Sequence, residues 1–399
     1  MCDERMTKQY RILAVSFLII IFVLGFLSDG KLIRYYVKDE VINEMWTPDL
    51  GEKKETEYAQ VFFGKDAFVN LNGLMRRIIG QSEMNTVVRL KNGQLTQVKQ
   101  KAKKKKDMKK EAANVAAFQT YLEGRGIPFL YVIPMDKIAP EDGSEKGVNG
   151  SDQIPTGFLD YSNKNIEMFR TQLDKYGVHY IDLRDDAQNA GQDWYSFFYK
   201  TDHHWNAEAG WMAYKKIEDW VVNNTNVQLD ERAGKIENYE IEEHRNCLLG
   251  SWGQRTGRLF GGTDDLRLYI PEYETDFENL TSGKRGRMDE VLYNRGAIQQ
   301  KPDMIYDNVY DSLDQIVDHS ASNQTTMLVV TDSFGRVVCP FLALGVRNMW
   351  FHSCYQTAQI NEEMIDRLQP DLVIVLQSAW NNLGSDASFS YDVPGIKKE

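Results

Sequence analysis

Two short polar segments of this chain carry the residue types that acyl transfer requires. Asp202 and His204 lie two residues apart, and Ser333 follows an apolar run at residues 326–330. A serine hydroxyl is a weak nucleophile until an imidazole takes its proton, and a carboxylate holds that imidazole in the productive tautomer. In an extended segment, Asp202 and His204 point to one side and His203 to the other. The spacing therefore predicts Ser333 as nucleophile, His204 as base and Asp202 as the carboxylate that orients it.

The serine is expected at the carboxyl end of a buried parallel strand. Residues 326–330 are apolar and rich in β-branched side chains, and a helix is expected over residues 336–344 although Pro340 interrupts it. Ligands of open α/β sheets bind at this edge of the sheet. Backbone N–H groups near the helix start, including that of Ser333, would then face a developing oxyanion.

The rest of the chain alternates between short apolar segments and amphipathic ones. Strands are expected over residues 129–133, 178–183, 346–351 and 372–376, and helices over 163–176, 362–368 and from the capping residue Asn206 to about 222. This alternation predicts an α/β fold, a parallel sheet with helices on both faces. Residues 223–318 show no sustained period, which predicts an irregular insertion that borders the active cleft.

The order of these motifs resembles one family. The D-H-H-W run at residues 202–205, followed later by D-S-F at residues 332–334, is similar to the DHHW proteins and to the alginate O-acetyltransferase-like branch of the SGNH hydrolase superfamily. In that branch the Asp and His precede the Ser, as they do here. Residues 129–134 with Lys137 are also similar, so the resemblance covers about residues 60–380.

The resemblance implies an SGNH-like, flavodoxin-like fold in a membrane-anchored, extracytoplasmic protein that moves acetyl groups onto polysaccharides or removes them. A cell-envelope polysaccharide would be the substrate, and a multi-pass, MBOAT-like membrane acyltransferase would be the partner that supplies acetyl groups. The superfamily also uses a glycine in its oxyanion hole. Gly250 is the candidate for this glycine, in addition to the Ser333 N–H. Thr331 stands where many relatives have glycine, and Gln377-Ser378 stands where relatives often carry Glu-Arg.

Aromatic side chains are frequent near His204, and they suggest a sugar-binding surface. Flat rings stack on sugar faces, so Trp205 and Tyr199 are the first candidates for substrate binding. Arg255 is a further candidate, for an anionic polymer. The alternative is that the rings pack in the core and the arginine is an ordinary surface residue.

A metal centre is the weaker alternative for the histidines. Adjacent His203 and His204 cannot easily both bind one ion, and neither a His-x3-His nor a Cys-x2-Cys spacing occurs. A metal site would need Asp202 and His204 to converge with Asp318 and His319. No metal and no other cofactor is therefore expected.

The chain has 399 residues and a net charge of −11, which argues against nucleic acid as a partner because phosphate binding needs a basic face. Three basic residues, Arg5, Lys8 and Arg11, precede a nearly unbroken apolar stretch. A basic flank before the first apolar stretch predicts an N-terminal membrane anchor, with the N-terminus in the cytoplasm and the rest of the chain across the membrane. The expected organisation is a cytoplasmic N-terminus (1–11), a transmembrane helix (12–28), a stalk (29–57), an SGNH-hydrolase-like domain (58–385) with the insertion at 223–318, and a tail (386–399).

The leading hypothesis is an extracytoplasmic O-acetyltransferase or acetylesterase with an acetyl-serine intermediate at Ser333. The alternative is a non-catalytic subunit that binds polysaccharide or scaffolds a membrane acetylation complex. In that case Ser333 only caps a helix, and Asp202 and His204 only organise a loop. A third hypothesis is a lipase or thioesterase near the bilayer, which acyl-chain preference would distinguish.

Overall fold

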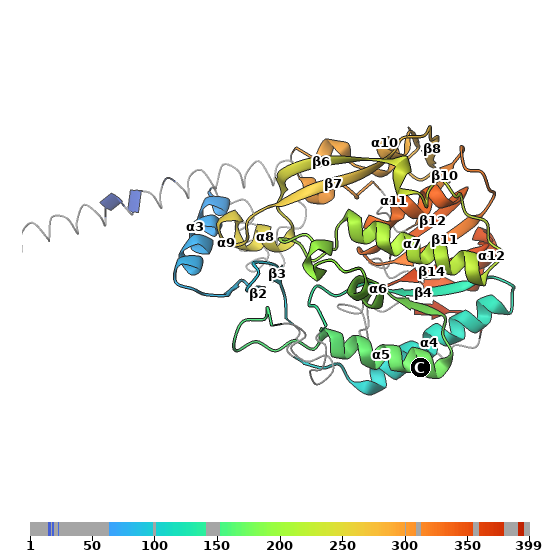
Figure 1. Cartoon of the computed structure of the whole chain (residues 1–399), viewed down its shortest axis with the longest axis horizontal. Coiled ribbons are helices and arrows are strands. Elements are labelled where there is room, and N and C mark those ends of the chain that lie inside the picture. Colours follow the sequence, from blue (N-terminus) through green and yellow to red (C-terminus); the bar gives the residue numbers. More distant parts are fainter. Residues whose placement is uncertain are drawn as a thin grey trace, which may run out of the picture. The chain divides into compact units, whose positions relative to one another are not determined.

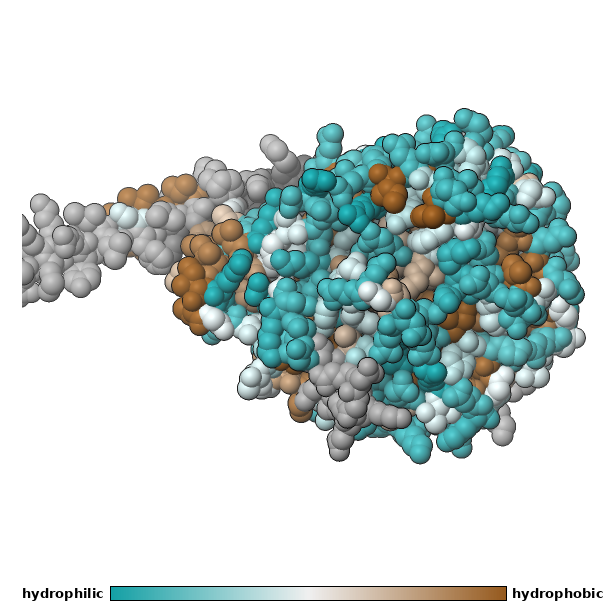
Figure 2. Space-filling view, in the orientation of Figure 1, coloured by the Kyte–Doolittle hydropathy of each residue, from teal (hydrophilic) through white to brown (hydrophobic). Residues whose placement is uncertain are grey.

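The computed structural model of the chain describes residues 15, 16, 18, 19, 23, 64–98, 101–140, 152–299, 301–308, 313–353, 359–378 and 390–394. These residues belong to two units, residues 1–79 and residues 80–399. The first unit contains helix α3 (Lys65–Ile78). Its side chains Phe68, Leu71 and Met75 are about half exposed and form an apolar stripe at helical spacing (Figure 2).

An eight-stranded sheet forms the centre of the second unit, in the order β5-β4-β14-β11-β12-β10-β8-β9 (Figure 1). Its parallel strands are β5 (Tyr180–Asp182), β4 (Phe129–Ile133), β14 (Leu372–Leu376), β11 (Thr326–Thr331) and β12 (Asn348–Ser353). Strands β4 and β14 are buried along their whole length, which explains their unbroken apolar sequences. The five strands expected from the sequence are therefore present, with different bounds for β5, β11 and β12.

The sheet is mixed, which corrects the expectation of a parallel one. Three further strands, β10 (Asp314–Asp318), β8 (Phe277–Asn279) and β9 (Lys284–Gly286), continue it beyond β12 through antiparallel pairings. The connection from β8 to β9 is too short for a crossover, so these two strands form a hairpin. Because β8 and β9 have three residues each, neither gives a recognisable period in the sequence.

Helices pack against both faces of the sheet. Helices α4 (Lys105–Glu123), α5 (Ser162–Tyr176) and α12 (Glu362–Leu368) share one core with strand residues such as Tyr131 and Val330. Helices α7 (Ala207–Asn224) and α11 (Gly335–Gly345) share the other core with Leu130 and Val329. Neighbouring residues of one strand thus serve opposite cores, as the pleat requires. The prediction of helices on both faces is confirmed.

Helix α7 begins where the sequence predicted, because the Asn206 side chain accepts a hydrogen bond from the Ala209 N–H at 3.1 Å. It then packs closely against α11. A Cβ at Gly210 would lie 2.8 Å from the Val337 carbonyl oxygen, so only glycine permits this approach. Pro340 lies inside α11 and does not end that helix.

Residues 223–318 are more regular than expected. Strand β6 (Tyr239–Leu248) pairs antiparallel with β7 (Asp264–Pro271), and helices α8 (Ser251–Thr256) and α9 (Arg258–Gly261) lie between them in the chain. Only the two end residues of β6 are buried, so its sequence lacks the alternation by which strands are recognised.

The remaining elements are β1 (Glu83–Met84), β2 (Val87–Arg89), β3 (Leu95–Thr96), α6 (Leu183–Asn189), α10 (Met288–Leu292), β13 (Gln359–Asn361), β15 (Ser390–Asp392), and the 3₁₀ helices η2 (Trp194–Phe197), η3 (Ile236–Asn238), η4 (Arg295–Ala297) and η5 (Pro302–Met304).

The predicted membrane anchor at residues 12–28 lies almost entirely outside the described residues, and so do the predicted cytoplasmic segment 1–11 and the stalk 29–57. Within the described part of the chain, no helix has both the length and the apolar character that a bilayer span requires.

Candidate active site

Ser333 lies on the turn that joins β11 to α11. Asp332 fixes this turn, since its Oδ1 accepts the Phe334 N–H at 3.0 Å. Its Oδ2 accepts the N–H and the hydroxyl of Ser378, at 2.8 and 2.6 Å, and Ser378 follows the neighbouring strand β14. Burial raises the pKa of Asp332, and these hydrogen bonds to the carboxylate oppose the rise. The turn therefore holds the serine at the carboxyl edge of the sheet.

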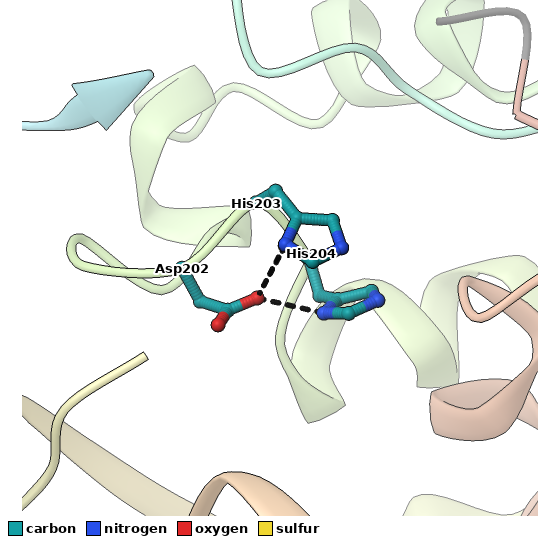
Figure 3. A group of neighbouring side chains, drawn as sticks. All are labelled: Asp202, His203 and His204. Carbon is teal, nitrogen blue, oxygen red and sulfur yellow. Dashed lines mark hydrogen bonds and ion pairs between the residues drawn. The ribbon is translucent and has the colours of Figure 1, made fainter. Parts of the chain in front are cut away.

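Asp202 and His204 come from the loop between η2 and α7. The Asp202 Oδ1 accepts the backbone N–H of His204 at 2.9 Å and lies 2.7 Å from its ring Nδ1 (Figure 3). The Asp202 Oδ2 accepts the N–H of Ser251, at the start of α8, at 2.5 Å. Two backbone donors and one imidazole thus hold the carboxylate in place.

The structure brings Ser333 to this loop from far away in the sequence. The His204 Nε2 lies 2.7 Å from the Ser333 Oγ. Because Asp202 accepts the proton on Nδ1, Nε2 is left to accept the serine proton. Burial alone would raise the pKa of Asp202, but His204, His203 and the Ser251 N–H together outweigh burial and hold that pKa well below its usual range. Hydroxyl, imidazole and carboxylate form one hydrogen-bonded row.

His203 does not point away from this row, which corrects the expectation for an extended segment. Its ring centre lies 3.7 Å from that of His204, and its Nδ1 lies 3.3 Å from the Asp202 Oδ1 (Figure 3). The same Nδ1 is 2.8 Å from the Ser251 Oγ. Burial, followed by the charge of His204, lowers the pKa of His203 to about 3, so His203 is neutral near pH 7.

A pocket opens beside the serine, and most of its wall is apolar or aromatic. Its lining residues are Tyr199, Asp202, His204, Leu248, Pro302, Asp303, Ile305, Tyr306, Ser333, Arg336 and Val337. Five of them come from residues 223–318, so this stretch borders the pocket as expected.

Of the two aromatic residues predicted to bind substrate, one lies at the pocket and the other does not. Tyr199 lines the pocket. Trp205 does not, because its ring is fully buried and its Nε1 donates to the Phe334 carbonyl at 2.9 Å. Its role is to join the His204 loop to the Ser333 turn, so the expectation that it stacks on a sugar is corrected.

Arg255 and Gly250 also differ from expectation. The Arg255 Nη2 donates to the Thr86 Oγ1 at 2.9 Å, and this arginine is not among the residues that line the pocket. The Gly250 N–H donates to the Thr201 Oγ1 at 2.9 Å, so it is already engaged and does not serve an oxyanion. Glycine is needed there for another reason, because a Cβ would lie 2.3 Å from the Cβ of Asp202.

An ion pair at the pocket was not predicted. The Arg336 Nη1 lies 2.6 Å from the Asp307 Oδ1, and Arg336 lines the pocket. The signal for Arg336 was present, since it follows Ser333 by three residues at the start of an expected helix and so lies one turn above it. Asp307 lies where the sequence shows no period, so its pairing with Arg336 was not foreseeable.

A metal ion would compete with the hydrogen-bonded row. Asp202, His203 and His204 offer ligand atoms that all lie within 4.8 Å of one another. The Nδ1 atoms of both histidines already lie within 3.3 Å of the Asp202 Oδ1, so an ion there would displace the bond that orients His204. His319 pairs instead with Glu278 at 2.8 Å, so the four-residue convergence considered from the sequence is not formed.

Comparisons with known proteins found similarity in part of the sequence and in the fold. Residues 94–274 match the family model described as an SGNH hydrolase-like domain, acetyltransferase AlgX. Among solved structures, Bacillus cereus PatB1 with a sulfonyl adduct has a TM-score of 0.61 at 17% identity, over 78% of this chain and 99% of that chain. A DHHW family protein from Eubacterium siraeum has a TM-score of 0.55 at 14% identity, over 76% of this chain and 94% of that chain. No curated protein sequence matches.

At these identities the two solved structures establish a shared fold, and the family match adds the enzyme class. The expectation of an enzyme of SGNH type is met by that match. The resemblance to the acetyltransferase branch of the SGNH hydrolase-like proteins is confirmed for residues 94–274, which contain the D-H-H-W run but not the D-S-F segment at residues 332–334.

Proposed function

We propose that this protein is a membrane-anchored, extracytoplasmic O-acetyltransferase that acts on a cell-envelope polysaccharide through an acetyl-Ser333 intermediate. The observation that carries the proposal is the row in which the His204 Nε2 lies 2.7 Å from the Ser333 Oγ and the His204 Nδ1 lies 2.7 Å from the Asp202 Oδ1. The match of residues 94–274 to an acetyltransferase family model supports the choice of acyl group.

In the first half-reaction, the Ser333 Oγ attacks the acetyl carbonyl of the donor while the His204 Nε2 takes the hydroxyl proton. The bond between the carbonyl carbon and the donor then breaks, and His204 returns the proton to the leaving group. Asp202 stabilises the imidazolium that forms between these steps. The Ser333 N–H is the proposed oxyanion donor.

In the second half-reaction, a sugar hydroxyl attacks the acetyl ester on Ser333. His204 takes the proton from this hydroxyl and then returns a proton to the serine oxygen as the ester bond breaks. The pocket wall formed by Tyr199, Ile305 and Val337 leaves little room beside the serine, which favours a short acyl group. Water in place of the sugar would give an acetylesterase.

The membrane anchor at residues 12–28 and the partner are parts of the same proposal. Activated acetyl groups are made in the cytoplasm, whereas the proposed site is across the membrane. A multi-pass, MBOAT-like acyltransferase would therefore supply the acetyl group, and the positive flank of the apolar stretch supports an orientation that places the site outside.

The test compares Ser333→Ala with wild type in the hydrolysis of para-nitrophenyl acetate. We expect at least a ~10³-fold loss of kcat, because the nucleophile is removed. Ser282→Ala, in the exposed turn between β8 and β9, is the matched control and should retain wild-type activity. Equal activity of Ser333→Ala and wild type would reject the proposal and favour a non-catalytic subunit.

Acyl-chain length and acceptor dependence extend this test. Para-nitrophenyl octanoate should react far more slowly than the acetate, because the pocket is small. The opposite preference would favour a lipase or thioesterase. Adding a polysaccharide fragment should divert acetyl groups from water to sugar hydroxyls, measured as acetylated sugar by mass spectrometry.

A further inference from the structure

The loop that carries Asp202 is held from the interior by one buried lysine. Lys137 follows strand β4, and its side chain is almost fully buried. Its Nζ donates to the carbonyl oxygens of Tyr199 and Asp202, both at 2.7 Å, and to that of Lys200 at 3.2 Å. An ammonium group has three N–H donors, and here one backbone segment receives all three.

A carboxylate binds the same segment through its amides. Asp264, at the start of β7, accepts hydrogen bonds from the N–H groups of Lys200 and Thr201, the second at 2.8 Å. It also accepts the Thr201 hydroxyl at 2.5 Å. The backbone of residues 199–202 therefore lies between a cation that binds its carbonyls and an anion that binds its amides.

This pair compensates for the lack of regular structure in the loop. Residues 200–204 form neither a helix nor a strand, so their backbone polar groups have no ladder to satisfy them. A buried carbonyl without a donor is costly, and the Tyr199 and Asp202 carbonyls both meet the Lys137 Nζ at 2.7 Å. The Lys200 carbonyl also accepts the Leu95 N–H at 2.8 Å, so it depends less on Lys137. Lys137 thus favours the loop conformation that brings the Tyr199 and Asp202 carbonyls to its ammonium group.

The conformation of this loop sets the position of the Asp202 carboxylate. The Asp202 carbonyl binds the Lys137 Nζ, and the carboxylate of the same residue orients His204. A shift of about 1 Å in the backbone at Asp202 would lengthen the bond to the His204 Nδ1, and misplacement on this scale can reduce a rate by ~10²-fold. Lys137 does not line the pocket, so it would act only through Asp202.

We propose that Lys137 is a positioning residue for the Ser333 reaction, and that its ammonium group, opposed by Asp264, holds residues 199–202 so that Asp202 orients His204. This inference rests on the proposed function. Its distinguishing consequence is a dependence of kcat on the charge of Lys137. A residue that only stabilised the fold would not produce one.

The surroundings of Lys137 make this charge titratable. Burial lowers the pKa of Lys137 to about 7, although the carboxylates of Asp264, Asp202 and Asp136 oppose the shift. The other groups that face it are the Trp252 ring, 4.9 Å from Nζ, and the imidazole of His203, which is neutral at this pH. The ammonium is therefore present below about pH 7 and is lost as pH rises through that value.

The experiment measures kcat and KM for para-nitrophenyl acetate from pH 5.5 to 9 in wild type, Lys137→Met and Lys137→Arg. Lys137→Met should lose ~10²-fold in kcat with KM changed little, since Lys137 does not touch substrate. Wild type should lose activity above about pH 7, and Lys137→Arg should not show this loss because arginine stays charged. Lys91→Met is the matched control, because Lys91 is an exposed lysine that also donates to a backbone carbonyl.

Asp264→Asn provides a second test that does not need the Lys137 variants to fold. Removing this carboxylate withdraws a group that favours the ammonium, so the alkaline loss of activity should move to lower pH. An unchanged midpoint in Asp264→Asn, or a wild-type pH profile in Lys137→Met, would overturn the inference. If Ser333→Ala abolishes activity and these changes are absent, the inference fails and the proposed function stands.

Discussion

The polar atoms of Ser333 and His204 lie 2.7 Å apart, yet the two pieces of backbone that carry them are held in different ways. Ser333 follows β11, a strand paired on both sides with β12 and β14. His204 lies on a loop whose backbone groups bind the side chains of Lys137 and Asp264. The sheet register therefore fixes the nucleophile, whereas buried charges from other parts of the chain fix its base.

This difference predicts where each half of the site is vulnerable. The Ser333 turn should tolerate the loss of a single hydrogen bond, because the strand pairings remain. The His204 loop lacks such a ladder. Its supports are single contacts from separate elements: the Lys137 and Asp264 side chains, the Leu95 and Gly253 N–H groups that donate to the Lys200 and Thr201 carbonyls at 2.8 Å, and the close contact between Gly250 and Asp202. The loop should therefore be less tolerant of a single loss.

The largest effect is expected for Asp202→Asn. The amide of the new side chain would stabilise the wrong tautomer of His204, in which Nε2 carries the proton and cannot accept one from Ser333. We therefore expect kcat to fall by ~10⁴-fold with the fold intact. Steady-state hydrolysis of para-nitrophenyl acetate measures the loss, and circular dichroism checks the fold. A loss of less than tenfold would mean that the carboxylate does not orient His204.

Gly250→Ala should have the next largest effect. The new methyl group would lie 2.3 Å from the Cβ of Asp202, so the loop or the start of α8 must move. We expect kcat to fall by ~10²-fold, since the carboxylate is displaced from His204. Gly124→Ala is the control, because its nearest neighbour would lie at 3.4 Å. Similar kinetics for both variants would show that the close contact at Gly250 does not matter.

Ser378→Ala tests the other half of the comparison. It removes the hydroxyl that binds the Asp332 Oδ2 and leaves the backbone N–H in place. The free energy of unfolding should fall by about 1.5–3 kcal/mol, typical of a hydrogen bond to a charged group, while kcat falls by less than roughly tenfold. Denaturant unfolding and the ester assay measure the two quantities. A loss of kcat as large as that of Gly250→Ala would remove the contrast between the two halves.

The smallest effect concerns the pH dependence of stability. The pKa of His203 is lowered from 6.5 to about 3, so between these values the unfolded chain binds a proton that the folded protein does not. Stability is therefore lost as pH falls through this window, by at most about 1.4 kcal/mol per pH unit. His203→Gln should remove up to one proton from this linkage, which lowers the slope of the unfolding free energy against pH by up to about 1.4 kcal/mol per pH unit. Urea unfolding from pH 4 to 7 measures this slope. An unchanged slope would mean that His203 is protonated in the folded protein.

Much of the Ser333 half was predictable from sequence, because it depends on local patterns. The apolar run of β11 and the helix after Ser333 both follow from residue type and spacing. The antiparallel edge was missed, since β8 has three residues and β10 begins and ends with aspartate. Strand β6 was missed because most of its residues are exposed.

The His204 half was predictable only as a motif. The extended-segment argument placed His203 on the opposite side, but the loop curves and brings both rings to Asp202. The burial of Trp205 and the engagement of Gly250 by Thr201 depend on residues that are distant in sequence. Local spacing carries no information on such contacts, so the supports of this loop became visible only in the structure.

The most direct test of the central claim is to trap the acyl-enzyme. Protein mixed briefly with an acetyl ester, quenched in acid and digested should show one acetyl group on the peptide that contains Ser333, located by tandem mass spectrometry. The adduct should be absent from Ser333→Ala and should form far more slowly in Asp202→Asn. An acetyl group on another residue, or the same rate of acetylation in Asp202→Asn and wild type, would contradict the account.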